Sequence, residues 1–156
     1  MSSKAHERPG LPVHPPVIYL VALMIGIGLN HKWPIAPMPG RWGDVIGIIL
    51  IVLGITIMPP VLLRFRRAGT SFNPHKPASA LITDGPYRLS RNPAYVALTL
   101  WYLGVGFALN NGWVLLLSPP LVLVMDRCVI RKEEQHLEAE FGEEYRRYKV
   151  TVRRWL

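Results

Sequence analysis

Residues 92–125 read NPAYVALTLWYLGVGFALNNGWVLLLSPPLVLVM, and this stretch decides the fold. Its 34 residues include no Asp, Glu, Lys or Arg. As one straight helix it would measure roughly 51 Å, whereas the hydrocarbon core of a bilayer is about 30 Å thick. Asn110-Asn111-Gly112 is a turn signal near its middle. The sequence therefore predicts a hairpin of two helices, residues 94–109 and 113 to about 130, the second broken at Pro119-Pro120.

Two further apolar runs precede the hairpin. Residues 45–63 are uncharged over 19 positions, which matches the length of a membrane span. Pro59-Pro60 should break this helix near its end. Residues 17–29 form a shorter run. The chain has 156 residues, of which 50% are hydrophobic and 18% charged, against about 25% charged in soluble proteins. We expect an all-α integral membrane bundle of about four transmembrane helices with a cytoplasmic C-terminal helix, and one domain over residues 1–156.

The distribution of basic residues predicts the orientation. With four spans, 16 of the 18 Lys and Arg residues fall on one side, and only Lys32 and Arg41 fall opposite. The positive-inside rule then places both termini, and any site built from the polar segments 64–91 and 126–156, in the cytoplasm. Trp33, Trp42 and Trp113 fall at the outer interface, where aromatic belts form. The net charge of +8 fits anionic lipid headgroups better than nucleic acid, so we expect a bilayer and no nucleic acid as partner.

The segment before the hairpin is polar and rich in turn residues. Asp84-Gly85-Pro86-Tyr87 is typical of a turn, and Pro93 suits the first position of a helix. Asn92 is then a natural N-cap. The alternative reading is that this helix N-terminus, beside Arg91, attracts the carboxylate of a cofactor or an acidic substrate.

Residues 126–148 predict a helix that continues from the membrane, with a break at Phe141-Gly142. Glu133 and Glu134 are either solvated or, beside a membrane pocket, bind ribose hydroxyls or a cationic group. Asp126 faces a partner or a water-filled cavity, or else pairs with Arg127 at the interface. The five histidines lack metal-ligand spacing, so we expect no metal.

Five ordered motifs carry a resemblance to a known family. They are Thr83-Asp84-Gly85-Pro86-Tyr87-Arg88, Ser90-Arg91-Asn92-Pro93-x-Tyr95, Glu133-Glu134-x-x-Leu137, Phe141-Gly142-x-Glu144-Tyr145-x-x-Tyr148 and Val152-Arg153-Arg154-Trp155-Leu156. Together they resemble the isoprenylcysteine carboxyl methyltransferase family and its bacterial relatives, which share features with phospholipid N-methyltransferases. The resemblance covers about half the chain, residues 73–156.

The resemblance implies an integral membrane enzyme that uses S-adenosyl-L-methionine to methylate a lipid-modified small molecule or peptide, which arrives laterally from the bilayer. It implies that three residues are catalytic: Arg91, Glu134 and Arg154. It implies that ten residues border the cofactor: His75, Gly85, Pro86, Tyr87, Asn92, Pro93, Tyr95, Glu133, Tyr145 and Tyr148. The eukaryotic branch has His where this chain has Asn92, and an amide cannot titrate.

The reaction expected first is O-methylation of an isoprenylcysteine-like carboxylate. Such an acceptor is already ionised, so Arg91 or Arg154 would orient it and no general base is needed. The alternatives are N-methylation of a phospholipid or other amine, for which Glu133 or Glu134 would take the proton, a non-catalytic lipid-binding or partner-binding protein, and a membrane reductase with a nicotinamide cofactor. The enzymatic interpretation requires that Arg91 and Glu134 meet in one cleft.

Overall fold

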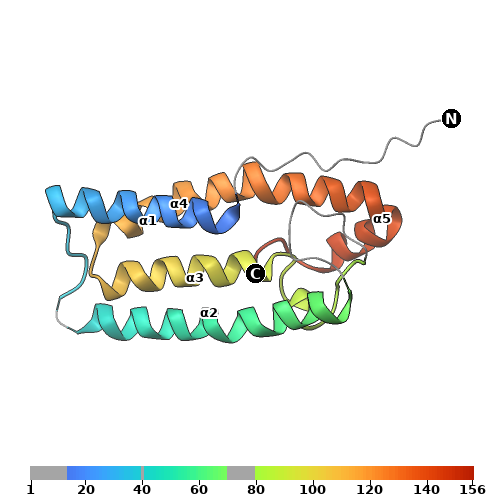
Figure 1. Cartoon of the computed structure of the whole chain (residues 1–156), viewed down its shortest axis with the longest axis horizontal. Helices are drawn as coiled ribbons and strands as arrows, with labels where there is room; N and C mark the ends of the chain where they lie inside the picture. Colours follow the sequence, from blue (N-terminus) through green and yellow to red (C-terminus); the bar gives the residue numbers. More distant parts are fainter. Residues whose placement is uncertain (1–13, 40, 70–79) are drawn as a thin grey trace.

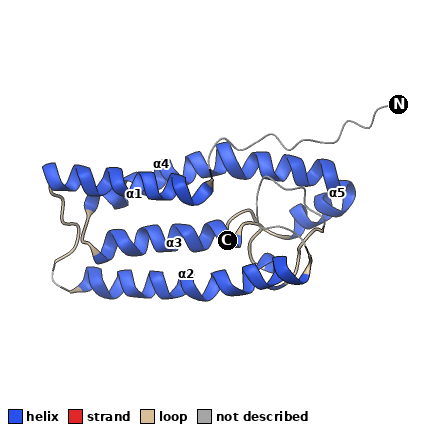
Figure 2. Cartoon of the chain, viewed as in Figure 1, coloured by secondary structure: helices blue, strands red, loops and turns tan. Residues whose placement is uncertain are grey.

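The computed structural model describes residues 14–39, 41–69 and 80–156. Within these segments the chain is helical and has no strand (Figure 2). The elements are α1 Pro15–Lys32, α2 Trp42–Arg67, the 3-10 turn η1 Gly85–Arg88, α3 Pro93–Ala108, α4 Gly112–Val124, the π-helical η2 Met125–Ile130 and α5 Arg131–Thr151. The segments α4, η2 and α5 follow one another directly and form one long helix. The predicted all-helical class is confirmed.

The predicted hairpin is confirmed as α3 and α4. Asn110 takes a positive φ of 46° at the turn. The side chain of Asn111 caps α4 by accepting a hydrogen bond from the backbone N–H of Val114 at 3.1 Å. Figure 1 shows α3 running between α2 on one side and the α1 and α4 pair on the other. The core between α1, α3 and α4 includes Tyr19 and Tyr102, whose rings meet edge to face with centroids 6.1 Å apart.

The two breaks predicted at proline pairs are wrong. Pro59-Pro60 lies inside α2 and Pro119-Pro120 lies inside α4, and both helices continue past them. A proline removes one N–H but leaves the flanking helical bonds in place, and apolar surroundings offer the backbone no competing partner. The break predicted at Phe141-Gly142 is confirmed, because Gly142 has φ 52° and ψ −121° inside α5. The chain bends there and returns toward the bundle.

The close approach of α2 and α3 depends on small residues. A Cβ added to Gly47 would lie 2.7 Å from the carbonyl oxygen of Gly104 and 2.7 Å from the backbone nitrogen of Ala108. Real Cβ atoms do not come this near to backbone atoms. Small residues at such positions let two helix backbones pack closely in an apolar environment. This contact fixes the position of α3, whose N-terminus carries Asn92 and Pro93.

The outer faces of the bundle are apolar. Leu20 and Met24 on α1 and Ile48 on α2 are more than half exposed. By length and composition, α2 and the helical run Gly112–Thr151, whose apolar part is α4, could each cross a membrane, and α3 is a shorter apolar helix of 16 residues. An exposed apolar surface of this extent is typical of contact with lipid. The protein is therefore a helical membrane protein, and in its described segments four apolar helices, α1 to α4, form the bundle.

Basic residues are concentrated at one end of the bundle, and Trp33 and Trp113 meet at the other. Arg64, Arg66 and Arg67 close α2 at the end where α5 lies, whereas Lys32 ends α1 at the opposite end (Figure 1). At that opposite end the indole N–H of Trp113 donates to the carbonyl oxygen of Trp33 at 2.6 Å. The polar segments 80–92 and 131–156 therefore share one end of the molecule.

Candidate functional site

The predicted meeting of Arg91 and Glu134 is confirmed. Arg91 lies immediately before α3 and Glu134 lies in the first turn of α5, yet Arg91 Nη2 is 3.3 Å from Glu134 Oε1. Both side chains are more than nine-tenths buried. A buried ion pair is costly unless further hydrogen bonds satisfy its remaining atoms. The partners of these two residues therefore define the site.

Arg154 supplies much of that compensation. Its Nη2 donates to Glu134 Oε2 at 2.6 Å and its Nε donates to Oε1 at 3.1 Å, which is a bidentate pair. Its Nη1 also donates to both carboxylate oxygens of Asp126, at 3.1 and 3.2 Å. The hydrogen bonds to Glu134 raise the pKa of Arg154 against the effect of burial. The permanently charged guanidinium of Arg154 thus bridges Asp126 of η2 and Glu134 of α5.

The last residues of the chain hold Arg154 in place through backbone contacts. The N–H of Arg91 donates to the carbonyl oxygen of Arg153 at 2.9 Å. The side-chain amide of Asn92 donates to the carbonyl oxygen of Arg154 at 3.0 Å, and the Ser90 hydroxyl donates to the same oxygen at 3.3 Å. The segment 152–156 therefore runs across the start of α3 and turns the Arg154 side chain toward the carboxylates of Glu134 and Asp126.

Asn92 occupies the predicted N-cap position of α3, but its side chain makes no capping hydrogen bond. The backbone N–H of Asn92 is instead bonded to the Ser90 hydroxyl at 3.0 Å. Since Pro93 has no N–H, the start of α3 has one fewer donor to satisfy. The amide is free to bind the carbonyl of Arg154, so the expected capping bond is wrong although the position is correct.

Arg91 keeps hydrogen-bonding capacity that its neighbours do not use. Among the residues that the structure describes, its Nε and Nη1 atoms are buried and have no hydrogen-bond partner. A buried donor without an acceptor costs about 1–3 kcal/mol. A guanidinium in this state is well suited to bind an anionic group of a ligand.

Four tyrosines surround the ion pairs. The hydroxyl of Tyr95, on α3, donates to Glu133 Oε1 at 2.8 Å, and that of Tyr148, on α5, donates to the carbonyl oxygen of Tyr87 at 2.7 Å. Burial raises the pKa of Tyr145 to about 12, the charge of Glu134 adds to this rise, and the charge of Arg91 opposes it. Burial also raises the pKa of Tyr87 and of Tyr148. These three phenols stay neutral at pH 7, and that of Tyr148 donates its hydrogen bond to η1.

The turn η1 lies against the end of α2. Gly85 has φ 59°, and a Cβ there would lie 2.8 Å from Arg64 Nε. Arg64 forms an ion pair with Asp84, and the ring of Tyr87 packs edge to face on Phe65. The turn predicted at residues 84–87 is thus confirmed, with Gly85 in the first position of η1 and Pro86 in the second. His75, the remaining predicted site residue, lies outside the described residues.

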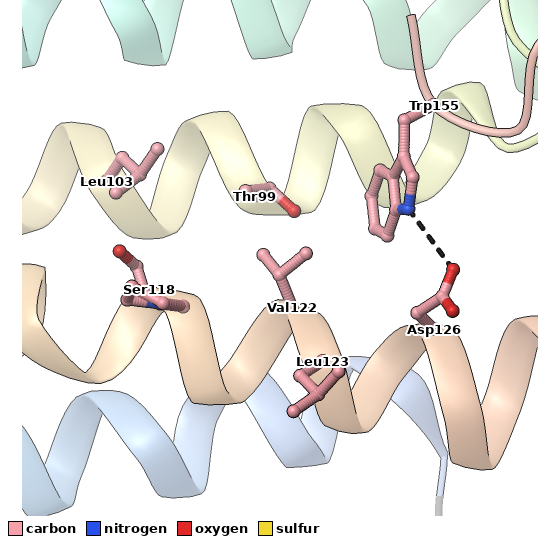
Figure 3. Close-up of a pocket in the computed structure, with 8 residues that line it drawn as sticks. Thr99, Leu103, Ser118, Val122, Leu123, Asp126 and Trp155 are labelled. Carbon is pink, nitrogen blue, oxygen red and sulfur yellow. Dashed lines mark hydrogen bonds between the residues drawn. The ribbon is translucent and has the colours of Figure 1, made fainter.

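Sequence reasoning missed a pocket beside the ion pairs and the part that Asp126 and Trp155 take in it. The pocket is an open groove between α3 and α4, has a volume of about 480 Å³ and ends at these two residues (Figure 3). The indole N–H of Trp155 donates to Asp126 Oδ1 at 3.4 Å. Of the two readings of Asp126, the one with a partner and a cavity is correct, because it bonds Arg154 and lines the pocket. Its spacing of seven and eight residues from Glu133 and Glu134, two helical turns, could have indicated a shared face.

The model of one known protein family matches most of this chain. The family model described as "Phospholipid methyltransferase" matches residues 42–144, from the start of α2 into α5. The matched range includes Arg91 and Glu134, whereas Arg154 and Trp155 lie beyond it.

Three curated proteins are similar over different parts of the chain. An "Uncharacterized protein" of Haemophilus influenzae is 44% identical over 62 residues, which is 40% of this chain and 98% of that protein. "Protein-S-isoprenylcysteine O-methyltransferase A" of Arabidopsis thaliana is 27% identical over 139 residues, covering 86% of this chain and 65% of that protein. "Protein-S-isoprenylcysteine O-methyltransferase" of Xenopus laevis is 31% identical over 124 residues, covering 71% of this chain and 39% of that protein. The chain thus spans less than two thirds of the length of these two methyltransferases.

Proposed function

Because this chain belongs to the phospholipid methyltransferase family, we propose that it is a membrane enzyme that transfers a methyl group from S-adenosyl-L-methionine to a lipid-linked acceptor. The observation that carries the proposal is the buried cluster of Arg91, Glu134 and Arg154 at one end of the bundle. The similarity to two isoprenylcysteine O-methyltransferases supports it. We further propose that residues 1–156 act as one domain.

The residues at the site fit this cofactor. Its amino-acid end carries a carboxylate and an ammonium group, which require a cation and an anion. The unpartnered nitrogen atoms Nε and Nη1 of Arg91 would donate hydrogen bonds to the carboxylate. Glu133, held by the Tyr95 hydroxyl, would bind the ammonium group or a ribose hydroxyl. When bound, the cofactor supplies an electrophilic methyl group on a sulfonium.

The other predicted residues would form the walls of the site. Gly85, Pro86 and Tyr87 belong to η1, and the Tyr148 hydroxyl ties this turn to α5. Asn92 and Pro93 at the start of α3 hold the segment 152–156 through the Arg154 carbonyl. Such ties fix the geometry in advance, so that donor and acceptor are held at about 3–3.5 Å, and this positioning supplies most of the acceleration in a displacement reaction.

Arg154 and Glu134 have the role of preorganising the site. Glu134 pairs with both Arg91 and Arg154, which fixes the orientation of Arg91 toward a ligand. Tyr145 is almost fully buried, and with Tyr148 it excludes water from the ion pairs. Low local polarity strengthens each of these charge interactions.

The acceptor could carry either of two reacting groups. The names of the similar plant and frog proteins favour a carboxylate and O-methylation. The family description favours an amine and N-methylation. Both reactions use the same donor site. The charge asymmetry of the bundle supports a cytoplasmic location of that site, in a bacterial inner membrane.

Titration calorimetry of the detergent-solubilised full chain tests the donor site. We expect binding of S-adenosyl-L-methionine by the wild type, and about tenfold to hundredfold weaker binding by Arg91→Gln, since charge-assisted hydrogen bonds are lost. Arg146→Gln is the matched control, because Arg146 makes an exposed ion pair with Glu143. Thermal unfolding of each variant verifies its fold. A folded wild type that binds a nicotinamide cofactor instead, or neither ligand, would contradict the proposal.

A further inference from the structure

We propose that Asp126 is a positioning residue of the donor site: it holds Arg154 so that the Glu134 carboxylate stays shared with Arg91, which then faces the carboxylate of the donor. The inference rests on the proposed function, because it concerns that same site. Asp126 does not touch the donor. It acts through the series of ion pairs that joins Asp126 to Arg154, Arg154 to Glu134 and Glu134 to Arg91.

The π-helical turn η2 brings Asp126 to the face of Glu134. The two residues are eight positions apart, which in an uninterrupted α-helix would place them about 80° apart around the axis. A π-turn has more residues per turn than an α-helix, so it reduces this angle. Both carboxylates therefore reach the guanidinium of Arg154. Turns of this kind are rare and are frequent at functional sites.

Arg154 divides its three nitrogen atoms between the two carboxylates. Nε and Nη2 donate to Glu134 at 3.1 and 2.6 Å, and Nη1 donates to the two oxygens of Asp126 at 3.1 and 3.2 Å. A guanidinium is planar and rigid, so acceptors on two sides fix its plane as well as its position. Without the Asp126 carboxylate, Nη1 loses both of these contacts.

The oxygen Oε1 of Glu134 is shared between two arginines. Arg154 Nε lies 3.1 Å from it, and Arg91 Nη2 lies 3.3 Å from it. The two guanidinium groups therefore compete for one buried oxygen. An Arg154 that has lost Asp126 retains only Glu134 among its carboxylate partners in the described segments, so it should move further onto Glu134 and displace Arg91.

Asp126 also balances the charge of the cluster. Arg91 and Arg154 both face Glu134, and a single carboxylate neutralises only one of them. Asp126 supplies the second negative charge. Its other cationic neighbour, Arg131, has its Nε 3.6 Å away and a side chain that is 54% exposed, so solvent screens that pair. The charge of Asp126 therefore acts mainly on Arg154.

Trp155 covers Asp126 where the pocket between α3 and α4 ends. Its indole N–H donates to Asp126 Oδ1 at 3.4 Å, and Figure 3 shows the two side chains facing each other there. An aromatic ring beside a carboxylate excludes water, which strengthens the interaction of that carboxylate with a neighbouring charge. Since Trp155 follows Arg154 directly, one short segment carries both the guanidinium and the ring that shields its partner.

Removal of the Asp126 charge has two opposite consequences for a bound carboxylate. The cluster becomes more positive, which attracts an anion, and Arg91 loses its fixed orientation, which weakens its hydrogen bonds to that anion. A guanidinium binds a carboxylate strongly only when its N–H groups are aligned with the oxygens. Arg154 and Glu134 stand between Asp126 and Arg91. We therefore expect the loss of orientation to dominate.

Two ligands that differ at the amino-acid end test the inference on the full chain in lipid nanodiscs. S-adenosylhomocysteine carries the carboxylate and the ammonium group, whereas 5′-methylthioadenosine has the same adenosine and a thioether without them. For Asp126→Asn we expect calorimetry to show about tenfold weaker binding of S-adenosylhomocysteine, as for the loss of one charge-assisted hydrogen bond, and less than about twofold change for 5′-methylthioadenosine. A structural defect would weaken both ligands alike.

Further variants test whether Asp126 acts through Arg154. Asp126→Glu keeps the charge and should bind S-adenosylhomocysteine within about threefold of the wild type. Asp126→Asn should add no further loss to Arg154→Leu, because the two side chains act as one unit. Arg131→Gln and Glu138→Gln are the controls and should leave the affinity for both ligands unchanged. Arg131 is the exposed partner of Asp126, and Glu138 forms an ion pair with Lys149 outside the site.

Three results would overturn the inference. They are unchanged or tighter binding of S-adenosylhomocysteine by Asp126→Asn, equal weakening of both ligands by that variant, and the same selective loss in Arg131→Gln. Each of them, with a wild type that binds S-adenosylhomocysteine, contradicts this inference alone. A folded wild type that does not bind S-adenosylhomocysteine contradicts the proposed function.

Discussion

Removal of the Arg154 side chain should lower the free energy of unfolding, by an amount that depends on how deeply its ion pair with Glu134 is buried. Breaking a buried ion pair by deleting one partner costs about 3–5 kcal/mol. The Arg154 side chain is 29% exposed and Glu134 keeps Arg91 as a partner, so we expect Arg154→Leu to lower the free energy of unfolding by about 2 kcal/mol. Glu134→Gln should cost a similar amount, since it leaves two guanidinium groups with one carboxylate fewer.

A double-mutant cycle isolates the interaction between these two residues. Contacting residues of one network typically show coupling energies of about 0.5–3 kcal/mol, and we expect about 1–2 kcal/mol for Arg154 and Glu134. The control cycle uses Arg146 and Glu143, whose closest atoms are also 2.6 Å apart but whose side chains are more than half exposed. That pair should couple by less than about 0.5 kcal/mol.

Unfolding in mixed micelles, followed by loss of helical circular dichroism as the fraction of dodecyl sulfate rises, gives the free energies for both cycles. The reasoning is refuted if the two cycles give equal coupling, because equal values would mean that burial does not strengthen the Arg154 interaction. It is also refuted if Arg154→Leu leaves the free energy of unfolding unchanged.

Two further predictions concern packing and pH. Gly47→Leu should abolish folding or lower stability by at least about 1–3 kcal/mol, since its side chain would collide with the backbone of α3. Gly28→Leu, where a Cβ meets nothing within 4 Å, should fold normally in the same assay. Because burial raises the pKa of Tyr145 to about 12, the folded state holds a proton that the unfolded state releases above pH 10, so stability should fall between pH 10 and 12. Tyr145→Phe should make that fall shallower, and an unchanged slope would contradict the prediction.

The sequence predicts the hairpin well because its signals are local. An uncharged run of 34 residues cannot be one span, and Asn110-Asn111-Gly112 supplies the turn that the structure has. The proline pairs mislead because their effect depends on context. A proline that would end an exposed helix only removes one bond in an apolar bundle, where the backbone has no other partner.

The site is predictable only in part, for a different reason. Arg91 and Glu134 meet as expected because both flank the same end of the bundle. The side chain of Asn92 was expected to cap α3, but it binds the Arg154 carbonyl, and this contact depends on where the segment 152–156 crosses. The pocket at Asp126 and Trp155 depends on the same crossing. The position of the segment 152–156 is set by contacts with residues far away in the sequence, so no local sequence pattern predicts it.

The most direct test of the central claim is an experimental structure of the full chain with S-adenosylhomocysteine, the demethylated form of the donor. The account predicts that the amino-acid end of this ligand lies within hydrogen-bond distance of Arg91, between η1 and α5. Density for the ligand at another place, or a saturated sample with an unliganded Arg91, would contradict it.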